Sequence, residues 1–244
     1  MYSHTGQFFR FAKRAVCLFV FLASSFSLYA QSSEWANHPA VIRGQVYVDL
    51  EPIYIGHVDE EYPLEIPAAG RRALEELALF FSGMVYGWSF YYDIGERARR
   101  IEENLELEQI GSVQFGDPAL RVTESEIRDM RLWIWADYHL DEGSQRRMDV
   151  WRTGTVRNAQ AMGYSPSYIE EYPGWIALKK MALEDAAKTA IRAMLQGSER
   201  NRPKAALGFI SLSSFPRYFI DGGRWAASAR FRVQINEIIP YAVY

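Results

Sequence analysis

The stretch RLWIWADYHLD, from Arg131 to Asp141, alternates regularly between two kinds of side chain. Successive side chains of a β-strand point to opposite faces, so the alternation predicts a strand with one buried face. The face predicted to join the core carries Leu132, Ile134, Ala136, Tyr138 and Leu140. The opposite face carries Trp133, Trp135, Asp137, His139 and Asp141. A strand that is buried on one face only is typical of an antiparallel sheet.

Similar periodicities place the other main elements. Period-two patterns predict strands near residues 41–50, 84–92, 131–140, 207–213 and 225–236. Helical spacing of apolar residues predicts helices over residues 68–83 and 175–196. Together these elements predict an α+β fold, in which a mostly antiparallel sheet carries the two main helices on one face.

Three intervening segments have weaker patterns. We expect a short helix within residues 96–109, a loop over residues 111–125 and a further helix around residues 145–162. Residues 215–220 are expected to be extended and to lead into a turn at Asp221-Gly222-Gly223.

The order of elements suggests an internal duplication. The tetrapeptide Glu-Glu-Tyr-Pro occurs at residues 60–63 and again at residues 170–173, each time shortly before a main helix. Strands follow each helix. We therefore expect two related halves, residues 41–141 and residues 170–236, within one α+β domain over residues 31–244.

The first 30 residues have the composition of a signal peptide. Arg10, Lys13 and Arg14 precede an apolar stretch over residues 15–26, and small residues before Gln31 offer a cleavage site at Ala30. The apolar stretch is shorter than the roughly 20 residues that a spanning helix needs. The sequence thus predicts a bacterial exported protein, located in the periplasm, with no transmembrane span after signal removal.

Cysteine content and charge narrow the classes of partner. Cys17 lies in the predicted signal peptide and is the only cysteine of the chain. Of the 27 Lys and Arg residues, three lie in residues 1–30, which hold no acidic residue. The remaining 24 stand against 30 Asp and Glu, a formal charge of −6. A nucleic-acid partner is not expected, because such partners require a basic surface. The chain also lacks a Gly-rich phosphate loop, and we expect no cofactor.

Two tryptophans on the polar face of the 131–140 strand are the main candidate binding residues. Trp133 and Trp135 could join Tyr47 and, from neighbouring strands, Arg230 and Arg232 in an aromatic and basic surface. Trp and Arg are the residue types that contribute most to interface energy, and such surfaces bind proteins or sugars. The alternative is that a helix or the 142–172 segment covers this face.

An enzymatic alternative uses the other residues of the same face. Asp137, His139 and Asp141 project together at spacings of roughly 7 Å between neighbours. A His between two carboxylates could bind a divalent metal or act as a general acid or base, as a periplasmic metal-dependent hydrolase would require. A solvated polar face explains the same pattern, and we assign no catalytic or metal-binding residue beyond this alternative.

A third alternative is a carrier for an apolar ligand. Residues 84–92 (MVYGWSFYY) form the most aromatic segment, with Met84, Tyr86, Trp88, Phe90 and Tyr92 on one face at period two. Such a face could line a cavity or fill a core.

The carboxyl-terminal part of the chain has a pattern found elsewhere. Residues 175–236 comprise an Ala-rich helix followed by strands that end in WAASARFRV. This arrangement resembles small exported α/β modules of flagellar-accessory and outer-membrane lipoproteins, although the lipid-bearing cysteine is absent here. The resemblance implies a structural or assembly role without catalytic residues.

Taken together, these features predict a non-catalytic exported cell-envelope protein with a binding or assembly role. We expect its partner to be another envelope protein or a second copy of itself, and we expect binding in preference to an enzymatic activity.

Overall fold

The computed structural model describes residues 41–52, 62–95, 100–168, 176–198 and 204–240, and these residues form helices and antiparallel strands. The helices are α2 (Ile66–Val85), α3 (Glu142–Val150) and α4 (Ala177–Ser198). The strands are β1 (Val41–Asp49), β2 (Trp88–Asp93), β3 (Asn104–Gln109), β4 (Leu120–Arg128), β5 (Arg131–His139), β6 (Arg157–Tyr164), β7 (Ala205–Leu212), β8 (Arg217–Asp221) and β9 (Arg224–Ile239). The predicted α+β fold is confirmed.

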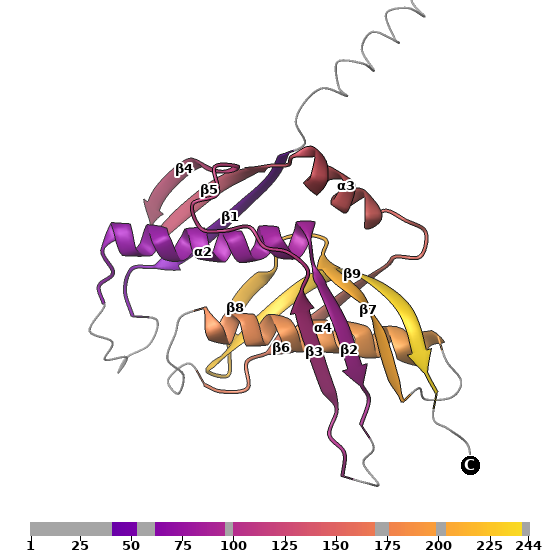
Figure 1. The fold of residues 1–244 in the computed structure, drawn as a ribbon. Helices are drawn as coiled ribbons and strands as arrows, with labels where there is room; N and C mark the ends of the chain where they lie inside the picture. Colours follow the sequence, from indigo (N-terminus) through magenta and orange to yellow (C-terminus); the bar gives the residue numbers. More distant parts are fainter. Residues whose placement is uncertain (1–40, 53–61, 96–99, 169–175, 199–203, 241–244) are drawn as a thin grey trace, which may run out of the picture. The chain divides into compact units, whose positions relative to one another are not determined.

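The strands divide between two sheets, where the sequence analysis placed them in one. A three-stranded sheet has the order β1-β5-β4, and a six-stranded sheet has the order β3-β2-β7-β9-β6, with β8 paired to β9 (Figure 1). The helix α2 packs on β1 and β5 of the first sheet and on β7 of the second. Residues 80–85 of α2 are all buried, so this end of the helix needs cover on every side, which one sheet cannot supply.

The small sheet has the predicted core face. Leu132, Ile134, Ala136, Tyr138 and Leu140 are all buried. Val46 and Val48 of β1 lie opposite Ile134 and Leu132 in the antiparallel register and extend the same apolar face. This face packs against α2.

Aromatic rings connect α2 to residues of both sheets. The centroid of Phe81 lies 5.5 Å from that of Tyr138 on β5 and 5.2 Å from that of Phe215, in the loop before β8. Phe215 also packs against Phe80, and its ring occupies the space that a side chain at Gly44 of β1 would need. The glycine in β1 is therefore required by the approach of this ring.

A buried ion pair joins α2 to α4. The Nζ atom of Lys179 donates to both carboxylate oxygens of Glu76 at 3.0 and 2.9 Å, and the two residues are 8% and 3% exposed. The rings of Tyr218 and Trp225 lie 5.5 and 4.9 Å from Nζ. Burial raises the pKa of Glu76, and the charge of Lys179 offsets part of this rise.

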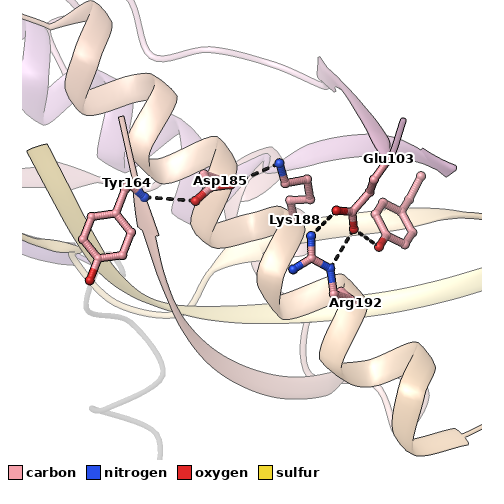
Figure 2. A network of polar contacts seen from close by, with 6 residues as sticks. Glu103, Tyr164, Asp185, Lys188 and Arg192 are labelled. Carbon is pink, nitrogen blue, oxygen red and sulfur yellow. Dashed lines mark hydrogen bonds and ion pairs between the residues drawn. The ribbon is translucent and has the colours of Figure 1, made fainter. Parts of the chain in front are cut away.

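A second polar network attaches the β2–β3 hairpin to α4. Arg192 of α4 donates from two nitrogens to the carboxylate of Glu103, which also accepts from the hydroxyl of Tyr92 (Figure 2). Burial raises the pKa of Glu103, but hydrogen bonds from Arg192 and Tyr92 outweigh this and leave the pKa below its usual value. Nearer the amino-terminal end of α4, Asp185 accepts a hydrogen bond from the backbone nitrogen of Tyr164 on β6 and forms an ion pair with Lys188.

The alanines of α4 allow it to lie close to the six-stranded sheet. Ala182, Ala186 and Ala190 are completely buried. A side chain at Gly163 of β6 would overlap the backbone of Ala182 and Ala186. The predicted narrow stripe of small residues thus corresponds to the contact of α4 with β6 and β9.

Three segments differ from the expectations. Residues 104–109, expected to lie in a short helix, form the strand β3. Residues 120–128, whose first part was expected to be a loop, form the strand β4. The helix expected around residues 145–162 is confined to α3, because its second part forms the strand β6, which pairs with β9. In each case strand pairing outweighs the weak local pattern: β3 pairs with the preceding strand β2, β4 with the following strand β5, and β6 with the distant β9.

Some expectations fall on residues outside the described ranges. The predicted signal peptide and most of the two Glu-Glu-Tyr-Pro segments lie there, so the signal and the duplication stay predictions. Within the described ranges, each helix is either too short or too polar to pass through a lipid bilayer.

We expect Gly163→Ala to lower the free energy of unfolding by about 1–3 kcal/mol, because the added methyl group forces α4 away from β6. Urea unfolding measures the change. Gly154→Ala is the matched control, because a side chain there would contact nothing within 4 Å, and its effect should stay within about 0.5 kcal/mol. Equal midpoints for the two variants would contradict the close helix–strand contact.

We expect Lys179→Met to cost about 3–5 kcal/mol of stability at neutral pH, because it leaves the buried carboxylate of Glu76 unpaired. Without Lys179 the folded-state pKa of Glu76 rises further above its unfolded value. The penalty should therefore be largest above the folded pKa and disappear below the unfolded pKa, where Glu76 is neutral in both states. Denaturant unfolding at several pH values tests this.

Two further variants serve as controls for the buried pair. Glu76→Leu combined with Lys179→Met should recover most of the loss, since no unpaired charge remains. Lys180→Met removes an exposed lysine 4.0 Å from Glu184 and should change stability by less than about 1 kcal/mol. A pH-independent penalty for Lys179→Met would show that lost packing, and not the unpaired charge, causes the effect.

Candidate functional site

The outer face of the three-stranded sheet carries a row of aromatic side chains. On the central strand β5, Trp133 lies opposite Tyr47 of β1 and Glu126 of β4, and the register sets Trp135 opposite Glu124. We call the face formed by Tyr47, Trp133, Trp135, Glu124 and Glu126 the aromatic face. Alternation along β5 places its tryptophans on the side opposite the core.

The three rings of the aromatic face contact one another in sequence. The centroids of Tyr47 and Trp133 are 4.9 Å apart with an interplanar angle of 41°, and those of Trp133 and Trp135 are 6.2 Å apart in a stacked arrangement. All three residues are half-buried. Their contacts fix the rings in place, so a partner would meet a preformed apolar surface.

Two arginines lie over two of these rings. The guanidinium carbon of Arg128 is 5.1 Å from the centroid of Trp133, and that of Arg131 is 4.6 Å from the centroid of Tyr47. Arg131 Nε also donates to Asp49 Oδ1 at 2.7 Å, and this hydrogen bond raises the pKa of Arg131. Burial and the nearby Asp49 raise the pKa of the Tyr47 hydroxyl, so it stays protonated at neutral pH.

Acidic side chains flank the tryptophans on the other side. Glu124 and Glu126 are exposed, and within the described ranges neither forms an ion pair. The aromatic face therefore combines an apolar centre with negative charge along β4 and positive charge at the Arg128–Arg131 turn. Such a mixed rim around aromatic residues is the usual composition of a protein interface.

One polar atom in the row has no partner. Trp133 Nε1 is buried, and no hydrogen-bond acceptor reaches it from the part of the chain that the structure describes. Leaving a buried donor unbonded costs roughly 1–3 kcal/mol. The ring contacts of Trp133 with Tyr47, Trp135 and Arg128 offset part of this cost.

The structure separates Arg230 and Arg232 from the tryptophans. Both arginines lie on β9 of the six-stranded sheet, whereas Trp133 and Trp135 lie on β5 of the three-stranded sheet. Arg230 is exposed, and Arg232 donates to the backbone oxygen of Leu212 at 3.5 Å. The predicted placement of Arg230 and Arg232 beside the tryptophans is wrong, and the arginines that lie over the rings of this face are Arg128 and Arg131.

The Asp137, His139 and Asp141 side chains do not gather into a metal site. Asp137 pairs with Arg43 at 3.4 Å across the β1–β5 register. Asp141 caps α3 by accepting from the backbone nitrogen of Ser144 at 2.6 Å, and this bond lowers the pKa of Asp141. Over the ranges that the structure describes, no three His, Cys, Asp or Glu residues lie close enough together to hold a metal ion.

The aromatic segment over residues 84–92 belongs to the core. Met84 ends up in α2, while Trp88, Phe90 and Tyr92 on β2 are buried among residues of the main apolar cluster. Phe90 fills the space above Gly208 of β7, and Trp88 fills the space above Gly83. These contacts give the segment a packing role.

Sequence reasoning missed Arg128, Arg131, Glu124 and Glu126 as parts of the site. A register shift between Val122 and Glu124 breaks the alternation of β4, so the strand lacked a continuous period-two pattern. The turn after β4 consists of Asp129 and Met130, both with positive φ, and lacks the glycine that signals most such hairpins.

Comparison with known proteins places the chain in a family. A protein-family model matches residues 36–241, which is most of the chain. The chain belongs to this family. It is also similar to an uncharacterized protein of Treponema pallidum (strain Nichols), with 28% identity over 174 residues that cover 71% of each chain. No solved structure matches the chain significantly.

The family match covers every strand of the aromatic face and both main helices, since all of them lie within residues 36–241. Neither comparison bears on the resemblance of residues 175–236 to flagellar-accessory and outer-membrane lipoprotein modules, which stays a prediction.

Proposed function

We propose that this protein is a non-catalytic, exported cell-envelope protein of the bacterial periplasm that acts by binding or assembly through its aromatic face. The observation that carries the proposal is the stacked row of Tyr47, Trp133 and Trp135, with an unbonded indole nitrogen at its centre. The partner is a protein in the same compartment.

The chemistry of the aromatic face supports a protein partner. Tryptophan and arginine are the residues most often found at the energetic centre of protein interfaces, and here Arg128 lies directly over Trp133. Glu124 and Glu126 add a charged rim that would select a partner with basic groups at matching positions. The rings are already ordered, so binding costs little side-chain entropy.

The proposed location rests on the leader sequence and on cysteine use. A basic start, a short apolar stretch and a small residue, Ala30, directly before Gln31 are parts of a cleavable signal. The region after residue 30 has no cysteine, and its α2–α4 core is held by the buried Glu76–Lys179 pair and by aromatic packing. It can therefore fold in an oxidising compartment without disulfide exchange.

We expect Trp133→Ser combined with Trp135→Ser to reduce partner binding at least about tenfold, since two central aromatic contacts are lost. A photo-reactive amino acid at the exposed position of Gln45, next to the tryptophans, should form a specific cross-link in cells. The double substitution should remove that cross-link. The measurement is the yield of the cross-linked species on a gel.

The control places the same photo-reactive group at Gln160, which is exposed on β6 of the other sheet. As a matched variant, Tyr91→Ser combined with Phe209→Ser removes two half-buried aromatics from the six-stranded sheet. Circular dichroism confirms that each variant remains folded. An unchanged Gln45 cross-link in the folded tryptophan variant would refute the binding role of the aromatic face.

We expect the protein isolated from cells to begin at Gln31, because a signal peptidase removes residues 1–30 during export. N-terminal sequencing of protein from periplasmic and cytoplasmic fractions measures this. Replacing Leu28 and Ala30 with bulky charged residues should block processing. Full-length protein in the cytoplasm, still carrying Met1, would contradict the proposed location and leave the aromatic face untouched as a binding site.

A further inference from the structure

The strand β4 is an edge strand that is exposed from Arg121 onward. It forms one edge of the β1-β5-β4 sheet, and every residue from Arg121 to Arg128 is exposed. Leu120 is the one half-buried residue of β4, whereas the edge strands β1, β3 and β6 each hold at least two residues that are half-buried or buried. Such an edge presents unpaired backbone N–H and C=O groups with which another strand can pair.

The core-side face of β4 is apolar and uncovered. Val122 and Ile127 lie opposite Ala136 and Leu132, which belong to the core face of β5. The helix α2 covers β1 and β5, yet Val122 and Ile127 remain 47% and 56% exposed. The apolar face of the sheet therefore continues past the helix onto its edge.

The hydrogen-bonding pattern restricts how another strand could join this edge. The two-residue turn makes Arg128 and Arg131 a hydrogen-bonded pair, so alternate residues of β4 direct their backbone groups outward. Outward-directed residues are Ile127, Ser125 and, beyond the register shift, Val122 and Leu120. Leu120 contributes only its carbonyl group, because its N–H already donates to Asp117 O.

One antiparallel register between two copies of β4 satisfies this pattern along eight residues. It pairs Leu120 with Ile127, Arg121 with Glu126 and Val122 with Ser125 of the second copy, and the two-fold symmetry repeats each pair. Outward-directed residues then meet each other in the Leu120–Ile127 and Val122–Ser125 pairs, while Thr123 and Glu124 at the register shift lie opposite each other in the middle of the pairing. Shifting the register by one residue would place outward-directed groups opposite groups that already face β5.

Side chains in this register are complementary. Arg121 and Glu126 both lie on the outer face, and both are exposed, so the symmetric pair forms two cross-strand contacts of opposite charge. On the core side, Leu120 meets Ile127. The register shift within β4 makes this possible, since it places Arg121 and Glu126 on the same face although they are five positions apart in the sequence.

We propose that the chain forms a symmetric dimer through antiparallel pairing of two β4 strands in this register. The pairing joins two three-stranded sheets into one continuous six-stranded sheet. Because the two-fold axis of an antiparallel strand pair is perpendicular to the sheet, both aromatic faces lie on the same side of it. The inference goes beyond the proposed binding function and specifies a second copy of this chain as an assembly partner.

The test uses charge reversal in the protein as cells process it. Sedimentation equilibrium should show a monomer–dimer equilibrium for the natural chain. Arg121→Glu places Glu against Glu126 at two symmetric positions, and Glu126→Arg places Arg against Arg121. Each single variant should raise the dimer dissociation constant at least about tenfold. The double variant restores opposite charges and should return the constant to within about threefold.

The matched control is Glu108→Arg, the same substitution at an exposed position on β3 of the other sheet, which should leave the equilibrium unchanged. A monomer at all concentrations up to about 1 mM would overturn the proposal. So would a dimer that is insensitive to the single reversals, or one that the double reversal fails to restore. None of these outcomes depends on the cross-linking partner of the aromatic face.

A cysteine pair reports the register directly. In a Cys17→Ser background, Arg121→Cys combined with Glu126→Cys brings thiols together only between two chains, because the two positions lie roughly 16 Å apart within one strand. Oxidation should give a covalent dimer. The pair Arg121→Cys and Ile127→Cys, on opposite faces, should give far less. Equal yields for both pairs would contradict the assigned register.

Discussion

The helix α2 is the constraint on which the rest of the structure depends, because its second half must be removed from water on every side. Residues 80–85 are buried without interruption, which an ordinary amphipathic helix does not require. One sheet covers this segment through Tyr138, and the loop that joins β7 to β8 covers it through Phe215. The buried pair of Glu76 and Lys179 then fixes α4 beside α2.

This arrangement explains why the aromatic face remains available. The small sheet uses one face to cover α2, and its other face has no comparable apolar element to cover among the described residues. The tryptophans there contact Tyr47 and Arg128 instead of core residues. Their positions follow from the alternation of β5, whose core side must meet the helix.

Much of this could be predicted from the sequence where the pattern is local. The core face of β5, the outward position of Trp133 and Trp135, and the two main helices follow from periodicity alone. The division into two sheets could not be predicted, because periodicity does not report which distant strands pair. For the same reason Arg230 and Arg232 were assigned to the wrong surroundings, since β9 and β5 carry similar alternation in different sheets.

The order of strand pairing also has a consequence for how the chain is made. Val41 at the start of β1 pairs with His139 at the end of β5, and β2 pairs with β7 more than a hundred residues later. A nascent chain can therefore complete the three-stranded sheet only after residue 139, and the six-stranded sheet only after β9 has been synthesised. The six-stranded sheet, whose central strand is β9, is therefore the last part of the fold that a growing chain can finish.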